Sequence, residues 1–295
     1  MCDSYTETIY IDNETGNVLK RIGQNLVIVF AEECEDLIVS TLIGYVFIIS
    51  AYIRDHYILI TLQGRVQING RPYDENGFKE IIIKVSRNNI RSTVISGTVL
   101  GSTRLELQGG TPFVYGNFLN CLKLEDESVD TPGCSFFILK LDEELRKVKL
   151  YTSLAGISAC KIFPTNNGGA EIISTTLVDG VSAGTVYVLA GDKLTMKLMT
   201  SGSQTEFNSA HSSGLISGVS SSEFSVGDCI IKGGTFVLKV YDDYQVKIHA
   251  HTEMRVVSKL KTEKSIFLLS DLYDIVDGSF VKTGSKLPSI SWLSV

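Results

Sequence analysis

The chain has 295 residues, of which 44% are hydrophobic and 20% are charged, and its formal net charge at pH 7 is -6. This composition is typical of a globular protein and excludes a disordered one, and the length suits two compact β domains or one large domain. The 27 basic residues are scattered and are outnumbered by 33 acidic residues. Because phosphate binding needs a dense basic patch, we expect no nucleic-acid partner.

The N-terminal sequence, MCDSYTE, is polar and acidic and does not resemble a secretory signal peptide. No two cysteines are closely spaced, so the sequence contains no CxxC metal or redox motif. We expect buried free thiols, although Cys121 and Cys134 flank an acidic loop and are the pair that oxidation could join. The six cysteines are Cys2, Cys34, Cys121, Cys134, Cys160 and Cys229.

The apolar runs from Thr8 to Val295 are short, rich in Ile, Val and Tyr, and closed by Gly, Asn-Gly or Asp-Gly turns. This pattern predicts an all-β protein with very little helix, built from two or more β-sandwich or jelly-roll-like modules. We place an N-terminal β module at residues 1–110. A central β-sandwich module follows at residues 111–232, and a C-terminal β segment at residues 233–295 can pack on it. Gly-Gly-Thr sequences at Gly109 and Gly233 mark the two boundaries.

The longest uncharged stretch, Leu37–Ile53, is near the lower length limit for a membrane-spanning helix. It is rich in β-branched residues, and a second apolar run, Tyr57–Leu62, follows the polar residues 54–56. Two strands joined by a polar turn explain this pattern better than one helix, so we do not expect a membrane association. Because the runs are continuous, we expect these strands to be buried on both faces.

Three later segments have distinctive patterns. Asp142–Lys147 lies between two apolar runs and is predicted as a hairpin tip rather than a helical turn. Ser201–Ser222 is rich in Ser and Gly and is predicted as a long exposed loop, where a binding surface would include Phe207, His211 and Phe224. Asp271–Val276 is a candidate helical turn.

The most specific chemical pattern is His249-Ala250-His251-Thr252-Glu253. Alternate residues of a strand share a face, so His249, His251 and Glu253 could together ligate a metal ion. The pattern is similar in part to the cupin H-x-H-x(3,4)-E motif, but the glutamate comes too early and no downstream histidine is apparent. The alternative is a polar, solvent-facing strand edge. Apart from a metal at His249 and His251, we expect no cofactor.

A second short motif, Gly180–Gly184, fits the G-x-S-x-G pattern of hydrolases. In hydrolases this serine stands on a turn between a strand and a helix. Here the next residues, Thr185–Leu189, are predicted as a strand, so we interpret the motif as a glycine-containing hairpin. No catalytic residue is therefore predicted.

These observations favour a non-enzymatic structural or adhesive protein. Our leading hypothesis is a viral or phage virion component, such as a capsid vertex, turret, spike or fibre, made in the host cytoplasm and located in the virion. Apolar strands with open edges predict a homo-oligomer or assembly with other virion proteins. A glycan or a cell-surface receptor is the expected external partner. The alternatives are a carbohydrate-binding β-sandwich protein and a cupin-like metal-binding protein.

Overall fold

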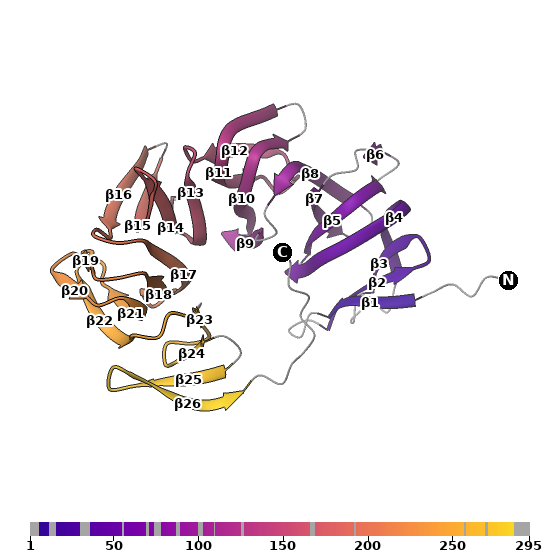
Figure 1. The fold of residues 1–295 in the computed structure, drawn as a ribbon. Helices are drawn as coiled ribbons and strands as arrows, with labels where there is room; N and C mark the ends of the chain where they lie inside the picture. The colour runs from indigo at the N-terminus through magenta and orange to yellow at the C-terminus, as the bar shows by residue number, and fades with distance from the viewer. Residues whose placement is uncertain are drawn as a thin grey trace. The chain divides into compact units, whose positions relative to one another are not determined.

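All regular structure in the described part of the chain is β-strand, as the computed structural model shows (Figure 1). Neighbouring strands are antiparallel and form several sheets, consistent with β-sandwich-like modules, so the predicted all-β class is confirmed. Within these residues no helix is long and apolar enough to cross a membrane. The structure describes residues 6–11, 16–29, 36–54, 56–68, 71–73, 78–86, 89–99, 103–108, 110–124, 127–165, 169–191, 193–256, 258–268 and 271–285.

The chain forms two compact units, Met1–Ala155 and Gly156–Val295. The boundaries predicted at residues 110 and 232 do not separate these units. Gly110 lies in the turn before a strand of the first unit's large sheet, and Gly234 begins a strand inside a sheet of the second unit. Both glycines have positive φ angles, 82° and 127°, which glycine adopts readily, and the predicted module boundaries stay a prediction.

Unit 1 contains one 12-stranded sheet, counted over the described residues, in which most neighbours are also consecutive in sequence. Two short strands lie off the main path, since β6 pairs with β5 and β9 pairs with β10. The strands are β1 (Thr6–Ile11), β2 (Val18–Ile22), β3 (Asn25–Val29), β4 (Asp36–Arg54), β5 (Tyr57–Ile68), β6 (Arg71–Tyr73), β7 (Phe78–Ser86), β8 (Asn89–Val99), β9 (Arg104–Gln108), β10 (Thr111–Leu124), β11 (Glu127–Leu141) and β12 (Lys147–Thr152).

Alternate residues of the central strands of unit 1 face two different cores. On β5, Ile58 and Ile60 lie in the first core, with Leu19, Leu42 and Ile81 among its other members. Leu59 lies in the second core, whose other members include Ile82, Leu105, Val114 and Phe137. Strands buried on both faces contain continuous apolar runs, as the sequence of β5 and β7 does.

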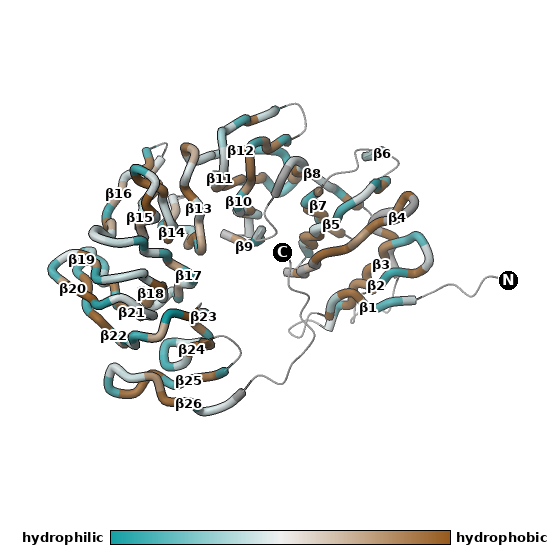
Figure 2. The backbone as a smooth tube through the Cα atoms, in the orientation of Figure 1, coloured by the Kyte–Doolittle hydropathy of each residue, from teal (hydrophilic) through white to brown (hydrophobic). Residues whose placement is uncertain are grey.

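The two strands predicted around Leu37–Ile53 and Tyr57–Leu62 are confirmed as β4 and β5. The prediction that both are buried on both faces is wrong for β4. Leu42, Val46 and Ile53 of β4 are buried in the first core. Phe47 is nevertheless 69% exposed and Ile49 is 44% exposed, although Figure 2 shows β4 as mostly hydrophobic. One face of this apolar strand is therefore left open.

Unit 2 contains three four-stranded sheets and one hairpin within its described residues. The first sheet has β13 (Ile157–Pro164), β14 (Ala170–Val178), β15 (Val181–Ala190) and β16 (Lys193–Met199). The second has β17 (Thr205–His211), β18 (Leu215–Ser220), β21 (Gly234–Val240) and β22 (Val246–Thr252), and β19 (Phe224–Val226) pairs with β20 (Cys229–Ile231). The third has β23 (Ser258–Leu260), β24 (Ser265–Leu268), β25 (Asp271–Val276) and β26 (Ser279–Ser285).

The second sheet of unit 2 is packed on both faces. On β21, Phe236 and Leu238 join a core with Val186 of the first sheet. Val237 points the other way, into a core with Ile266 of the third sheet. The successive sheets therefore stack in layers, with alternate residues of one strand serving two cores.

Two local predictions in unit 2 are wrong. Residues 201–222 do not form a long exposed loop, because β17 and β18 occupy most of that segment. Some small polar side chains of the segment bond to one another, as Ser203 Oγ and Ser220 Oγ do at 2.6 Å. Asp271–Val276 is not a helical turn but strand β25, which pairs on both sides with β24 and β26.

Candidate functional site

The predicted metal ligands lie on and just after β22, but the strand is irregular there. Val237 pairs with Ala250 and Leu238 pairs with Ile248, so His249 is an extra residue at a β-bulge. A bulge disrupts the alternation of side chains that the prediction assumed. Glu253 follows the last residue of β22 and is exposed. Among the described residues, no group of three His, Cys, Asp or Glu side chains is arranged to hold a metal ion.

His251 instead makes contacts that stabilise the fold. Its Nε2 lies 3.0 Å from the Lys232 carbonyl oxygen and 3.3 Å from that of Gly233, which places a proton on Nε2. Its backbone N–H donates to the Gly278 carbonyl at 3.3 Å, and so connects β22 to the β25–β26 turn. Metal binding at His249 and His251 therefore stays a prediction with no assembled ligand set.

The predicted binding residues Phe207 and Phe224 belong to the core. They are 3% and 2% exposed and pack against Phe236, with ring centroids 6.2 Å and 4.9 Å away. His211 is the last residue of β17, and its Nδ1 lies 2.9 Å from the Ser213 hydroxyl oxygen in the adjoining turn. The two buried rings have no face available for stacking a ligand.

The cysteines placed by the structure are free and partly buried. Cys121 and Cys134 lie on the paired strands β10 and β11 as thiols, as do Cys160 and Cys229 elsewhere. Burial raises the pKa of the Cys160 thiol to about 12, so this group stays protonated and unreactive at neutral pH. Cys2 and Cys34 lie outside the described residues.

The most unusual ionisable group is one that the sequence patterns did not single out. Glu80 of β7 is fully buried, and its two carboxylate oxygens accept hydrogen bonds from Thr61 Oγ1 at 2.7 Å and Thr103 Oγ1 at 2.9 Å. Burial raises the pKa of the Glu80 carboxyl to about 7, and the two threonine bonds only partly oppose that rise. The only signal in the sequence was a glutamate directly before the apolar run Ile81–Ile83.

The position of Glu80 explains its burial. Thr61 lies on β5, beside β7, whereas Thr103 lies immediately before β9. The carboxyl thus ties the sheet to the segment that leads into β9. A Cβ atom on Gly116 would lie only 2.9 Å from Thr103 Oγ1, so the surroundings are tightly packed. This group can hold or release a proton within a tightly packed part of the sheet.

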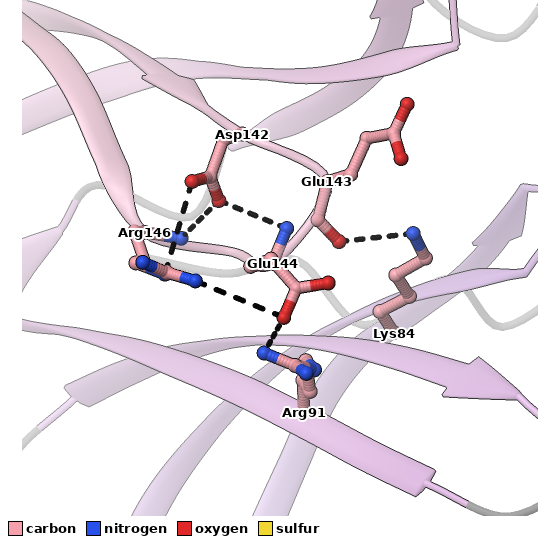
Figure 3. A network of polar contacts seen from close by, with 6 residues as sticks. All are labelled: Lys84, Arg91, Asp142, Glu143, Glu144 and Arg146. Atoms are coloured by element: carbon pink, nitrogen blue, oxygen red, sulfur yellow. Dashed lines mark hydrogen bonds and ion pairs between the residues drawn. The ribbon is translucent and has the colours of Figure 1, made fainter.

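A second polar network lies at the other end of β7. Asp142 Oδ1 accepts hydrogen bonds from the backbone N–H groups of Glu144 at 2.9 Å and Arg146 at 2.8 Å (Figure 3). Lys84 Nζ donates to the Glu143 carbonyl at 2.9 Å, and Arg91 forms an ion pair with Glu144. The hairpin tip predicted at Asp142–Lys147 is confirmed, and these contacts fix it to β7 and β8.

In unit 2, two carboxylates from separate segments interact. The pKa of Glu171 on β14 is raised by burial and then by the negative charge of Asp242 in the β21–β22 turn. Tyr244 lies near both groups, and the Lys197 ammonium lies 5.7 Å from its ring centroid. Asp242 is exposed, so this group is a solvated polar cluster rather than an enclosed catalytic pair.

No protein-family model matches the chain, and no curated protein matches it. The functional conclusion therefore depends on the surfaces of the two units. The G-x-S-x-G motif gives no catalytic serine, because Asp179 and Gly180 form the turn of the β14–β15 hairpin and Ser182 continues into β15. The exposed apolar side chains are the remaining feature that points to a function.

Proposed function

We propose that this protein is a non-enzymatic structural or adhesive protein that assembles with copies of itself, as a component of a virion surface. The main observation in favour of self-assembly is a hairpin tip with exposed apolar side chains. Leu177, Val178 and Val181, which we call the tip patch, are 57%, 39% and 44% exposed. Val178 and Val181 project from one face of this hairpin and Leu177 from the other. Exposed apolar side chains at such a tip favour a contact that removes them from water.

The geometry of the hairpin supports this use. Asp179 and Gly180 have φ angles of 50° and 80°, as a tight two-residue turn requires, and Val178 pairs directly with Val181. Such a turn holds the tip patch in a fixed shape. A fixed apolar projection loses little conformational entropy when it is buried in an interface.

The virion location is supported by fold-level analogy and by charge. Antiparallel sheets stacked in layers make rigid units that can present surface groups. A net charge of -6 suits an outward position better than a surface that lines a packaged genome.

The test is the mass of the full-length protein in solution, measured by sedimentation velocity over a range of concentrations. We expect a defined oligomer, and we expect the double variant Leu177→Ser, Val181→Ser to shift it toward the monomer. Lys193→Ser, at an exposed position that starts β16, is the matched control and should leave the mass unchanged. A wild-type protein that is monomeric at all concentrations would contradict the proposal. A double variant with the same oligomeric mass as the wild type would contradict it too.

A further inference from the structure

The register of three neighbouring strands in unit 1 aligns two aromatic rings and an amide. Phe47 of β4 pairs with Gln63 of β5, and Gln63 pairs with Phe78 of β7. These three strands are neighbours in the sheet (Figure 1). Directly paired residues of antiparallel strands project from the same face of a sheet. We call Phe47, Gln63 and Phe78 the aromatic row.

The aromatic row lies where the sheet face changes from buried to open. On β5 this face begins with Leu59 in the second core and continues with Thr61, which is 3% exposed. At the next position on the same face, Gln63 is exposed. Phe47 is 69% exposed and Phe78 is partly exposed, so the row is accessible from solvent.

The spacing and chemistry of the row fit a sugar chain. Phe47 and Phe78 are two strand spacings apart, about 10 Å, with the Gln63 amide between them. An aromatic face attracts the slightly positive C–H groups on one side of a sugar ring. The amide offers both a donor and an acceptor to sugar hydroxyls, and Arg65, exposed on the same face of β5, adds further donors.

Two other classes of partner also use exposed aromatic rings. Phe and Arg are enriched in protein–protein interfaces, so a contact between copies is the outcome that the sedimentation measurement has to distinguish. Single-stranded nucleic acid also stacks on aromatic rings, but it needs a positively charged groove to follow its backbone. Arg65 adds one positive charge to the row, and the net charge of the chain is -6, so nucleic acid fits the row less well.

We infer that the aromatic row of β4, β5 and β7 is a binding site for an oligosaccharide, with one sugar ring stacked on Phe47 and hydroxyl groups bound by Gln63 and Arg65. The inference deepens the adhesive part of the proposed function. It does not require the tip patch, which lies in the other unit.

The experiment is binding of the full-length protein to an array of neutral, acetamido and acidic oligosaccharides, followed by calorimetric titration of the tightest glycan found. Phe47→Ala is expected to weaken binding about tenfold or more, and Phe47→Trp to retain it. Ile38→Ala is the matched control, because Ile38 is an exposed apolar residue of the same strand outside the row, 53% exposed. It should bind as the wild type does.

The outcomes separate this inference from self-assembly. The inference is wrong if the folded wild-type protein binds no glycan on the array, or if Phe47→Ala binds as tightly as the wild type. It is also wrong if Phe47→Ala changes the sedimenting mass, because the row would then be a contact between copies. Glycan binding by a strictly monomeric protein would support the row and contradict only the proposed oligomer.

Discussion

Replacing Glu80 by glutamine is expected to make unit 1 more stable at pH 8 and to leave its stability almost unchanged below pH 4.5. The pKa of Glu80 rises from 4.5 to about 7 in the folded protein because the carboxyl is buried. Between these two values the unfolded chain has lost the proton that the folded protein still holds. Stability therefore falls as pH rises through this window and stays at the lower level above it.

The size of the effect follows from the same two values. A difference of this size between the folded and unfolded pKa corresponds to about 3 kcal/mol in the free energy of unfolding at pH 8. Glutamine has nearly the same shape, and its carbonyl oxygen can accept the bond from Thr61 Oγ1, 2.7 Å from the carboxylate in the native protein. Its amide can donate to the Thr103 hydroxyl, whose oxygen also accepts hydrogen bonds.

The assay is urea denaturation at several pH values between 4.5 and 8, followed by far-ultraviolet circular dichroism. The wild type should lose stability across this range, and Glu80→Gln should show a flatter pH dependence. Glu7→Gln removes an exposed glutamate of the same unit and is the control. A Glu80→Gln variant that keeps the pH dependence of the wild type, or that is less stable than the wild type at pH 8, would contradict this role of the buried carboxyl.

Three further substitutions test contacts seen in the two units. Asp142→Ala removes the two backbone hydrogen bonds of the β11–β12 tip and should cost about 1 to 2 kcal/mol in urea unfolding, whereas no loss would mean that the tip is held by other contacts. Gly184→Ala would bring a Cβ within 2.6 Å of the Phe207 ring, so we expect a loss of about 1 to 3 kcal/mol by the same measurement, and an unchanged midpoint would contradict the packing. His251→Ala should lower stability by about 1 kcal/mol through loss of the bond to Lys232 and should leave the metal content measured by mass spectrometry unchanged. Metal retained by the wild type and lost in this variant would instead support the metal site.

The sequence predicted the strand content well because apolar runs of strand length between turn residues are a local signal. The hairpin turn at Asp179 was predictable for the same reason, since Asp and Gly favour the positive φ angles found there. The tip at Asp142 was predictable from the apolar runs on both sides, although its positive φ angle belongs to Leu145. The segment 201–222 was not predictable in this way. Its serines and glycines are typical of loops, but Gly218 lies against the Phe236 ring and the hydroxyls of Ser203 and Ser220 bond to each other.

The site predictions relied on a period of two, which assigns residues to faces only in a regular strand. The bulge at His249 breaks that assignment within β22, and metal binding there stays a prediction. The binding surface predicted at Phe207 and Phe224 relied on their position in or beside a Ser/Gly-rich segment, and both rings are buried. Neither feature can be recognised without knowledge of the pairing.

Pairing register is also what gives Phe47 its proposed role. In the sequence it belongs to one long apolar stretch, and nothing there distinguishes it from Val46 or Ile48, which face the first core. The distinction arises because β4 pairs with β5, where the residue opposite Phe47 is a glutamine rather than another apolar side chain. The second core covers the inner part of this sheet face, and none of its members among the described side chains belongs to β4. The second layer therefore covers only part of this sheet face. Glu80 on β7 is buried, whereas Phe47 on β4 is exposed, and only β5 lies between these two strands.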